Sequence, residues 1–154
     1  MTNSRQISWN RLVQQAEGLL SVSSNRISNA ANLSALLFQE LADISWVCFY
    51  FLHDKSLMLG PFQGQPACVS VPMGKGVCGT AAARGETIRV ADVDTFDGHI
   101  VCDPRARSEI VVPLFKRGEL LGVLDVDSGS LDRFDEEDEI GLKSLAQVYL
   151  SSIE

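Results

Sequence analysis

The apolar residues of the chain are spaced as in helices near both ends. Residues 8–21 and 28–44 each begin with a serine, which is a good N-terminal helix cap, and repeat apolar residues every three or four positions. Residues 135–153 begin with acidic side chains, which suit a helix N-terminus. The apolar stripe predicted for this last helix consists of Ile140, Leu142, Leu145, Val148 and Tyr149. We therefore expect two helices before the central region and one after it.

The central region has the pattern of strands. Residues 45–52, SWVCFYFL, are rich in aromatic and β-branched side chains, and glycines and prolines bound shorter candidate strands at 57–62 and 67–71. Residues 75–85 predict a short helix that ends at its last glycine and carries Cys78 in its first turn. Strands thus dominate the middle of the chain, with one helix among them.

Residues 109–116 and 119–127 predict a β-hairpin, because two apolar runs meet at a short turn that contains a glycine. We expect a three-residue loop at 116–118, which fixes the register of the pair, whereas a two-residue loop would turn Glu109 to the opposite face. In that register one face of the hairpin packs against helices. Its expected residues are Ile110, Val112, Leu114, Leu120, Leu124 and Val126.

The other face of this hairpin is expected to carry three acids. The register places Glu109 opposite Asp125, and Asp127 joins them by the strand period of two. Carboxylates on a half-buried face are unfavourable unless a cation or a shared proton offsets their charge. The three acids are therefore candidates for binding a cationic group.

The order of elements predicts an α+β fold. Helices at both ends that flank a run of strands favour an antiparallel sheet, with the N- and C-terminal helices packed on one face and loops on the other. With 154 residues the chain is long enough for one domain with its own core. Its 45% hydrophobic and 21% charged residues are typical of a globular protein.

The charge of the chain narrows the class of partner. The formal net charge of −7 argues against nucleic acid and anionic membranes, since both attract cationic surfaces. The N-terminal residues have no apolar run like that of a secretory signal, and no segment reaches the roughly 20 apolar residues of a membrane span. We expect a cytoplasmic protein, and the negative charge leaves open a small ligand that carries an ammonium.

Four cysteines are the main candidates for chemistry. Cys48 lies in an aromatic strand and is expected to pack in the core, whereas Cys68, Cys78 and Cys102 lie in segments rich in glycine, proline or polar residues. In a reducing compartment permanent disulfides are not expected. The chain has no CxxC pair, and its two histidines complete no zinc spacing, so we expect no metal site.

Five motifs make the sequence similar to a known family. They are SWVCFYFL, LGPFQGQPAC, GKGVCGTAA, GHIVCDPRARSEIVVPL and GVLDVDS, and they occur in this order over roughly residues 40 to 130. The chain resembles the free methionine-(R)-sulfoxide reductases, a family built on a single GAF domain. The resemblance implies one GAF domain over residues 1–154 and an oxidoreductase that reduces free methionine-(R)-sulfoxide.

The resemblance also implies roles for the loop cysteines. Cys102 corresponds to the catalytic thiol, which attacks the sulfoxide sulfur and is left as a sulfenic acid. Cys68, or failing that Cys78, then condenses with it to a disulfide, which thioredoxin reduces. No other cofactor is implied. The thiolate of Cys102 could be favoured by Arg105 and Arg107, or it could form only when the cationic substrate binds.

The resemblance carries over pocket residues as well. Trp46 and Tyr50 are expected around the methylthio end of the substrate. Glu109 and Asp127 are expected to bind its ammonium, and Asp125 to polarise or protonate the sulfoxide oxygen. Cys48 stands where the family usually has a small residue and could touch the pocket. The family also suggests a homodimer.

Two other functions remain open from the sequence. The first is a GAF sensor that binds a small ligand and signals through a partner, because most domains of this fold are sensors. The second is a thiol switch that responds to peroxide without turning over methionine sulfoxide. A histidine beside the nucleophile, His99, is a further candidate for activating the thiol, although the family scheme does not depend on it.

Overall fold

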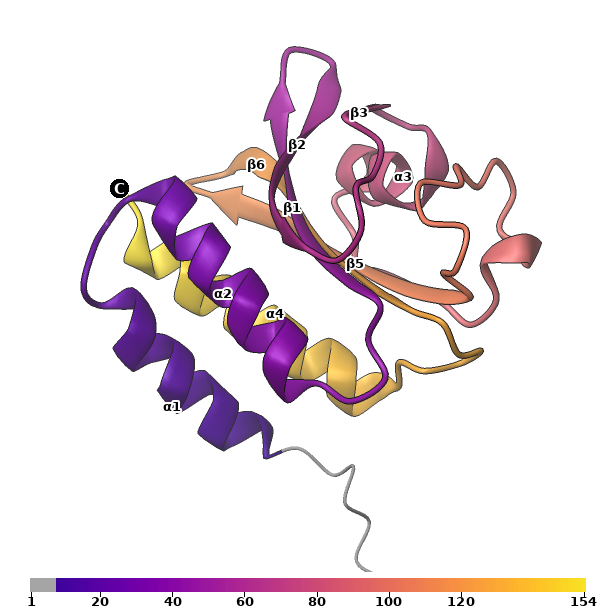
Figure 1. Cartoon of the computed structure of the whole chain (residues 1–154). Helices are drawn as coiled ribbons and strands as arrows, with labels where there is room; N and C mark the ends of the chain where they lie inside the picture. The colour runs from indigo at the N-terminus through magenta and orange to yellow at the C-terminus, as the bar shows by residue number, and fades with distance from the viewer. Residues whose placement is uncertain (1–7) are drawn as a thin grey trace, which may run out of the picture.

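The computed structural model describes residues 8–154 and contains four α-helices and six strands in this range (Figure 1). In chain order these are α1 Trp9–Leu20, α2 Arg26–Glu40, β1 Trp46–His53, β2 Ser56–Gln63, β3 Ser70–Pro72, α3 Gly76–Arg84, β4 Ile88–Val90, a 3-10 turn at Val93–Thr95, β5 Ser108–Lys116, β6 Glu119–Ser128 and α4 Glu136–Ser152.

The strands form one antiparallel sheet in the order β3-β2-β1-β6-β5-β4. Helices α2 and α4 cover one face, and α1 packs outside them as a further layer (Figure 1). Helix α3 and the long connection between β4 and β5 lie on the other face. The predicted α+β arrangement, with terminal helices on one side and loops on the other, is confirmed.

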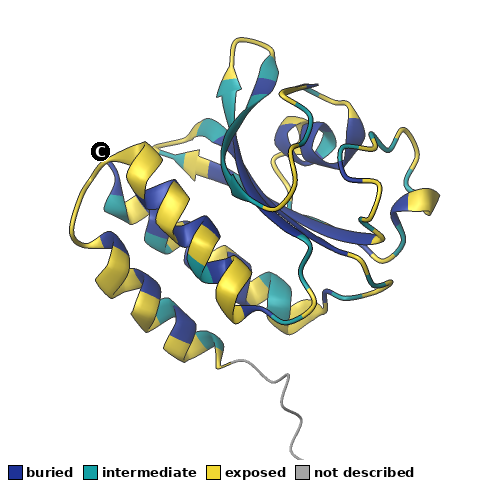
Figure 2. Cartoon of the chain, viewed as in Figure 1, coloured by how far each residue is buried: buried dark blue, intermediate teal, exposed yellow. Residues whose placement is uncertain are grey.

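Both faces of the sheet are buried (Figure 2). The face under α2 and α4 belongs to a large core that includes Leu37, Phe49 and Tyr149. The opposite face forms a second core around Trp46, Tyr50 and Val111. Burial on two sides explains why β1, β5 and β6 read as nearly continuous apolar runs rather than as alternating ones.

The first two helices each begin at a side chain that caps the helix N-terminus. The Ser8 side chain accepts a hydrogen bond from Arg11 N and caps α1, as predicted. The cap predicted at Ser28 is wrong, because Asn25 takes that role and accepts a hydrogen bond from Ser28 N at 2.9 Å. Asn25 lies three residues earlier, so α2 gains almost a full turn.

Helix α4 begins with a capping box in which Asp135 and Asp138 each accept a hydrogen bond from the other's backbone N–H. Leu142, Leu145 and Tyr149 of the predicted stripe are buried. The prediction for Ile140 is wrong, since 59% of that residue is exposed. Ile140 precedes Leu142 by two residues and Leu145 by five, and in a helix with 3.6 residues per turn these separations turn its side chain away from the buried face.

The hairpin turn differs from the predicted one. Lys116 pairs with Glu119, so the loop has two residues, Arg117 and Gly118, with φ of 53° and 80°. Two consecutive positive φ values match the twist of adjoining strands better than a longer loop does. The predicted three-residue loop is therefore wrong.

A β-bulge corrects the effect of the shorter loop. The register shifts between Leu114 and Phe115, which pair with Gly122 and Leu120, so Leu121 is an extra residue in β6. Glu109 consequently pairs with Asp127, not with Asp125 as predicted, but it still lies on the same face as both aspartates. Leu120 lies between the turn and the bulge, so the shorter turn alone sets its position; the prediction for Leu120 is wrong, because it packs on the opposite face from the helices.

Strand β4 was not predicted; it has three residues and pairs with β5, with Val90 opposite Glu109. Within residues 8–154 no helix is long and apolar enough to cross a membrane. The expectation that the N-terminus is no secretory signal falls partly on residues 1–7, which lie outside the described residues.

Candidate active site

Three carboxylic acids meet on the face of the sheet opposite α2 and α4. Glu109 projects from β5, and Asp125 and Asp127 project from β6. Asp127 pairs with both Glu109 and Trp46, and Asp125 pairs with Cys48. All three acids are at least 94% buried. The pleat of two neighbouring strands therefore brings the predicted acids together inside the protein.

Burial is the main influence on these acids. It raises the pKa of Glu109, Asp125 and Asp127 well above the usual range for carboxyl groups, and the negative charges of the neighbouring acids raise it further. Among residues 8–154 none of the four ion pairs includes Glu109, Asp125 or Asp127, so no cationic side chain is paired with the three acids. The cluster therefore keeps its protons to a higher pH than ordinary carboxyl groups do, and a cationic ligand would offset the charge of any acid that ionises.

We predict that these acids make the free energy of unfolding of the substrate-free protein fall as pH rises above about 4, the usual carboxyl pKa of the unfolded chain. Because the folded pKa is raised, the native state keeps protons that the unfolded chain releases. Stability is therefore highest below the unfolded pKa and is lost as pH rises through the folded pKa. Each such proton contributes a slope of about 1.4 kcal/mol per pH unit.

Urea unfolding between about pH 4.5 and 7.5, under reducing conditions, measures this slope. Glu109→Gln removes one titrating group and should flatten the slope by up to one proton. Glu119→Gln changes an exposed glutamate at the hairpin turn and should leave it unchanged. Parallel slopes for wild type and Glu109→Gln would show that Glu109 does not hold its proton.

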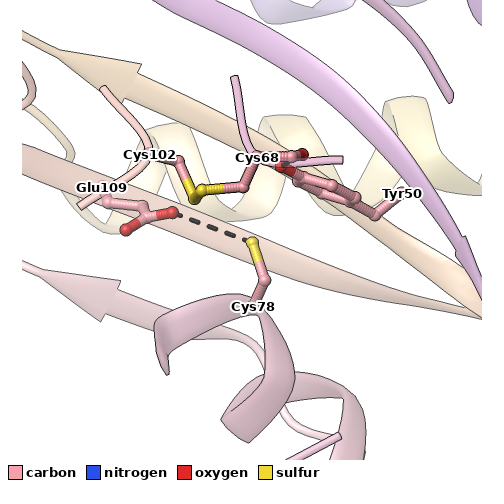
Figure 3. Close-up of a disulfide and its surroundings, with 5 residues drawn as sticks. All are labelled: Tyr50, Cys68, Cys78, Cys102 and Glu109. Atoms are coloured by element: carbon pink, nitrogen blue, oxygen red, sulfur yellow. Dashed lines mark hydrogen bonds between the residues drawn. A yellow bond between two sulfur atoms is a disulfide. The ribbon is translucent and has the colours of Figure 1, made fainter. Parts of the chain in front are cut away.

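Two of the three loop cysteines form a disulfide. Cys68 precedes β3, Cys102 lies in the connection between β4 and β5, and their Cα atoms are 5.1 Å apart (Figure 3). The Tyr50 hydroxyl donates a 2.8 Å hydrogen bond to the backbone carbonyl of Cys68. This bond ties the segment that carries Cys68 to β1, beside the segment that carries Cys102.

The third cysteine lies beside the acids. Cys78 projects from α3, and its Sγ is 3.9 Å from Glu109 Oε2 (Figure 3). Its thiol is buried, and burial together with the charge of Asp125 raises its pKa. Cys48 is also buried, and burial followed by the charge of Asp125 raises its pKa. Both thiols are therefore protonated at neutral pH, which makes them poor nucleophiles in this state.

A small cavity connects the disulfide to the acids. Its volume is about 30 Å³, which has room for one or two water molecules. Every site residue predicted from the sequence except Cys68 lines it, and Cys68 is bonded to a residue that does. The lining residues are Trp46, Tyr50, Val71, Gly76, Val77, Cys78, His99, Ile100, Cys102, Asp103, Ala106, Glu109, Asp125 and Asp127.

Some residues considered from the sequence lie elsewhere. Cys48 does not line the cavity, although it packs in the same core as Trp46 and Tyr50. Arg105 donates to Asp103, and Arg107 is exposed, so neither guanidinium lines the cavity. His99 does line it, and burial lowers the pKa of its imidazole, which favours the neutral form.

The cavity wall contains polar atoms without partners. Within residues 8–154 these include Trp46 Nε1, Asp103 Oδ2, Asp125 Oδ1 and Asp127 Oδ1. Buried polar atoms normally have a hydrogen-bond partner, so unpaired atoms around one cavity indicate a place for a polar ligand. Three acceptors and one donor suit a ligand that brings several donors and at least one acceptor.

Three side chains of the cavity also meet a distance condition for metal binding. One ligand atom each from Cys78, Glu109 and Asp125 lies within 4.8 Å of the others. The site mixes one thiol with carboxyl groups whose raised pKa values keep them protonated, whereas metal ligands must be deprotonated. A metal ion would have to displace these protons in order to bind, and the absence of a metal site stays a prediction.

Sequence reasoning missed Asp103, which lines the cavity next to Cys102, and the amino end of α3, which contributes Gly76 and Val77. The signal for Asp103 was its position before a proline, where an aspartate often accepts hydrogen bonds within its own turn. For α3 the signal was a glycine-rich start with no side chain suited to capping.

Comparison with known proteins agrees with this geometry. A family model described as the GAF domain matches residues 29–154. Free methionine-R-sulfoxide reductase of Escherichia coli (strain K12) is 51% identical over 127 residues, which cover 82% of this chain and 77% of that protein. The solved structure of fRMsr of Staphylococcus aureus in reduced form is similar over 100% of both chains, with a TM-score of 0.95 and 45% identity. Its complex with substrate is similar over 97% of both chains, with a TM-score of 0.92 and 44% identity.

Proposed function

The chain belongs to the free methionine-R-sulfoxide reductase family of GAF-domain proteins, and from this premise we propose that it is an oxidoreductase that reduces free L-methionine-(R)-S-oxide to methionine. The observation that carries the proposal is one cavity lined both by Cys102, which is bonded to Cys68, and by three buried acids with raised pKa values. A reductive step at a sulfoxide needs a nucleophile and protons, and Cys102 in its reduced form and these acids would supply them.

We propose Cys102 as the nucleophile. Its sulfur attacks the substrate sulfur and forms an S–S bond, and the S–O bond breaks as the oxygen takes up two protons and leaves as water. A water molecule then cleaves the S–S bond, which releases methionine and leaves a sulfenic acid on Cys102. The thiol of a second cysteine then attacks the sulfenic sulfur, and the oxygen leaves as water. The substrate gains two electrons, and the pair of cysteines loses them in forming the disulfide.

Cys68 is the second cysteine in this proposal. It is bonded to Cys102 in the structure, whereas Cys78 keeps a free thiol in contact with Glu109. The sequence left both cysteines open for this role, and the observed pairing favours Cys68. A protein dithiol such as thioredoxin would then reduce the bridge by thiol exchange. Thioredoxin, a cytoplasmic location and a homodimer stay predictions.

The acids would act on the polar groups of the substrate. Their raised pKa values keep protons available at neutral pH, which suits a general acid for the sulfoxide oxygen. We assign this role to Asp125, and the binding of the ammonium to Glu109 and Asp127. Once an ammonium is bound, its positive charge favours ionisation of the nearest carboxyl, so one of the three can carry charge while another keeps its proton.

The carboxylate and the methylthio group of the substrate also have candidate partners in the cavity. The backbone N–H groups at the amino end of α3 suit its carboxylate, because Lys75 at the N-cap offers no side-chain hydrogen bond and Gly76 and Val77 line the cavity. The aromatic rings of Trp46 and Tyr50, whose centroids are 6.0 Å apart, suit the methylthio end through contacts between sulfur and aromatic rings.

The buried acids would disfavour a thiolate on Cys102. The sequence left two sources of compensation open, the two arginines and the substrate itself. Arg105 is engaged by Asp103 and Arg107 is exposed, which supports the substrate ammonium as the charge that favours the thiolate. The nucleophile would then become reactive only in the complex.

Mass spectrometry after a single turnover tests this function. Reduced protein is mixed with methionine-(R)-sulfoxide without a reductant, and free methionine and disulfide-linked peptides are measured. We expect about one methionine per chain and a bridge between Cys68 and Cys102. A sensor would bind without releasing methionine, and a peroxide switch would oxidise without needing the amino acid. A bridge between Cys48 and Cys68 that leaves Cys102 untouched would contradict the scheme.

A further inference from the structure

A fourth carboxyl group lies in the cavity without a role in the scheme above. Asp103 follows Cys102 in the chain and is only 6% exposed, although Pro104 and Arg105 after it are exposed. Its Oδ1 accepts hydrogen bonds from Arg105 N at 3.0 Å and from Arg105 Nε at 3.4 Å. Its backbone carbonyl accepts from Ala106 N at 3.1 Å. One oxygen of this carboxyl group therefore closes a tight turn.

The second carboxyl oxygen of Asp103, Oδ2, takes no part in this turn. Asp103 Oδ2 is buried and has no hydrogen-bond partner within residues 8–154. Since Arg105 takes Oδ1 and Asp103 lines the cavity, Oδ2 is the oxygen left to face a ligand. A buried carboxyl oxygen without a partner is unfavourable, so a turn cap alone does not explain why this residue is buried rather than exposed.

Asp103 faces the same space as Asp127. Asp127 Oδ1 is also buried without a partner, and both residues line the cavity. The two groups are close enough that the charge of Asp103 raises the pKa of Asp127. Two unpaired carboxyl oxygens around one small space suit a primary ammonium, which has three N–H donors and a positive charge.

We propose that Asp103 Oδ2 binds the ammonium group of the amino-acid substrate together with Asp127, and so positions the neighbouring Cys102. Because the ammonium ligand and the nucleophile are consecutive residues of one loop, binding of the ammonium fixes the loop from which Cys102 attacks. This inference rests on the proposed function and adds to it a residue that selects for a free amino group.

Asp103→Asn tests the proposal, because an asparagine keeps the turn acceptor and removes the charge. We expect kcat/KM for methionine-(R)-sulfoxide to fall about 10- to 100-fold, mainly through KM, as for a lost hydrogen bond to a charged group. The matched control is Asp92→Asn, since Asp92 accepts a similar turn hydrogen bond from Asp94 N outside the cavity. That variant should keep the wild-type KM.

Two further measurements separate ligand binding from loop structure. The desamino analogue of methionine sulfoxide, used as a competitive inhibitor, should bind wild type and Asp103→Asn about equally because it has no ammonium. The rate at which iodoacetamide alkylates Cys102 in the reduced, substrate-free protein should not fall, because removing a negative charge beside the thiol favours the thiolate. An unchanged KM, or equal losses for substrate and analogue, would overturn the proposal. Wild-type protein that releases no methionine would instead overturn the proposed function.

Discussion

Replacing Cys102 by serine is expected to abolish methionine formation from methionine-(R)-sulfoxide, with a loss of at least about a thousandfold. A serine hydroxyl does not attack sulfur under these conditions, and the remaining thiols are poor substitutes. Cys48 lies outside the cavity, and burial raises the pKa of Cys78. Chromatography of free methionine, with dithiothreitol as the reductant, measures the effect.

Substitutions of the other cysteines test the role of each thiol in the proposed reaction. Cys68→Ser should release about one methionine per chain and then stop when thioredoxin is the reductant, because Cys102 is oxidised but cannot form the bridge. Cys48→Ala should keep most of the wild-type rate, since that residue does not line the cavity. Full activity of Cys102→Ser with rapid loss in Cys48→Ala would show that another thiol is the nucleophile.

Local patterns predicted the elements of the fold better than they predicted its boundaries. The serine cap of α1 and the left-handed Gly85 that ends α3 were recognised, because each depends on neighbours in sequence. The start of α2 was misplaced because Asn25 and Ser28 are both good caps, and only the fold decides between them. Strand β4 has three residues and is defined by its pairing with β5.

The acidic face was found in spite of a wrong register. The true turn is one residue shorter than predicted, which alone would have turned Glu109 to the opposite face. The bulge at Leu121 adds one residue to β6 and returns Glu109 to the face that carries Asp125 and Asp127. The two deviations cancel for the acids but not for Leu120, which lies between the turn and the bulge.

Long-range features of the site could not be predicted in this way. Cys68 and Cys102 are 34 residues apart, and only the folding of two connections over the same face brings them within bonding distance. The burial of Asp103 has the same origin, since its loop lies over the cavity. The sequence marked these residues as candidates through composition, whereas their contacts depend on the packing of segments far apart in the chain.

The disulfide and the substrate compete for the same space. With the bridge formed, the cavity has about 30 Å³, room for one or two waters, while methionine sulfoxide is many times larger. The segment that contains Cys102 must therefore move away from Cys68 before the amino acid can enter. A ligand that binds only one of two states stabilises that state, so the substrate should favour the reduced enzyme.

We therefore predict that methionine-(R)-sulfoxide binds the oxidised wild-type protein at least about 100-fold more weakly than it binds reduced Cys102→Ser, which cannot turn it over. Calorimetric titration measures both affinities without catalysis, because the bridge also blocks the nucleophile. Cys102→Ser treated with the same oxidant is the control, since it cannot form the bridge to Cys68 and should keep its affinity. Equal affinity of the oxidised and reduced proteins would mean that the substrate binds outside this cavity, and the assignment of Glu109, Asp125 and Asp127 would then be wrong.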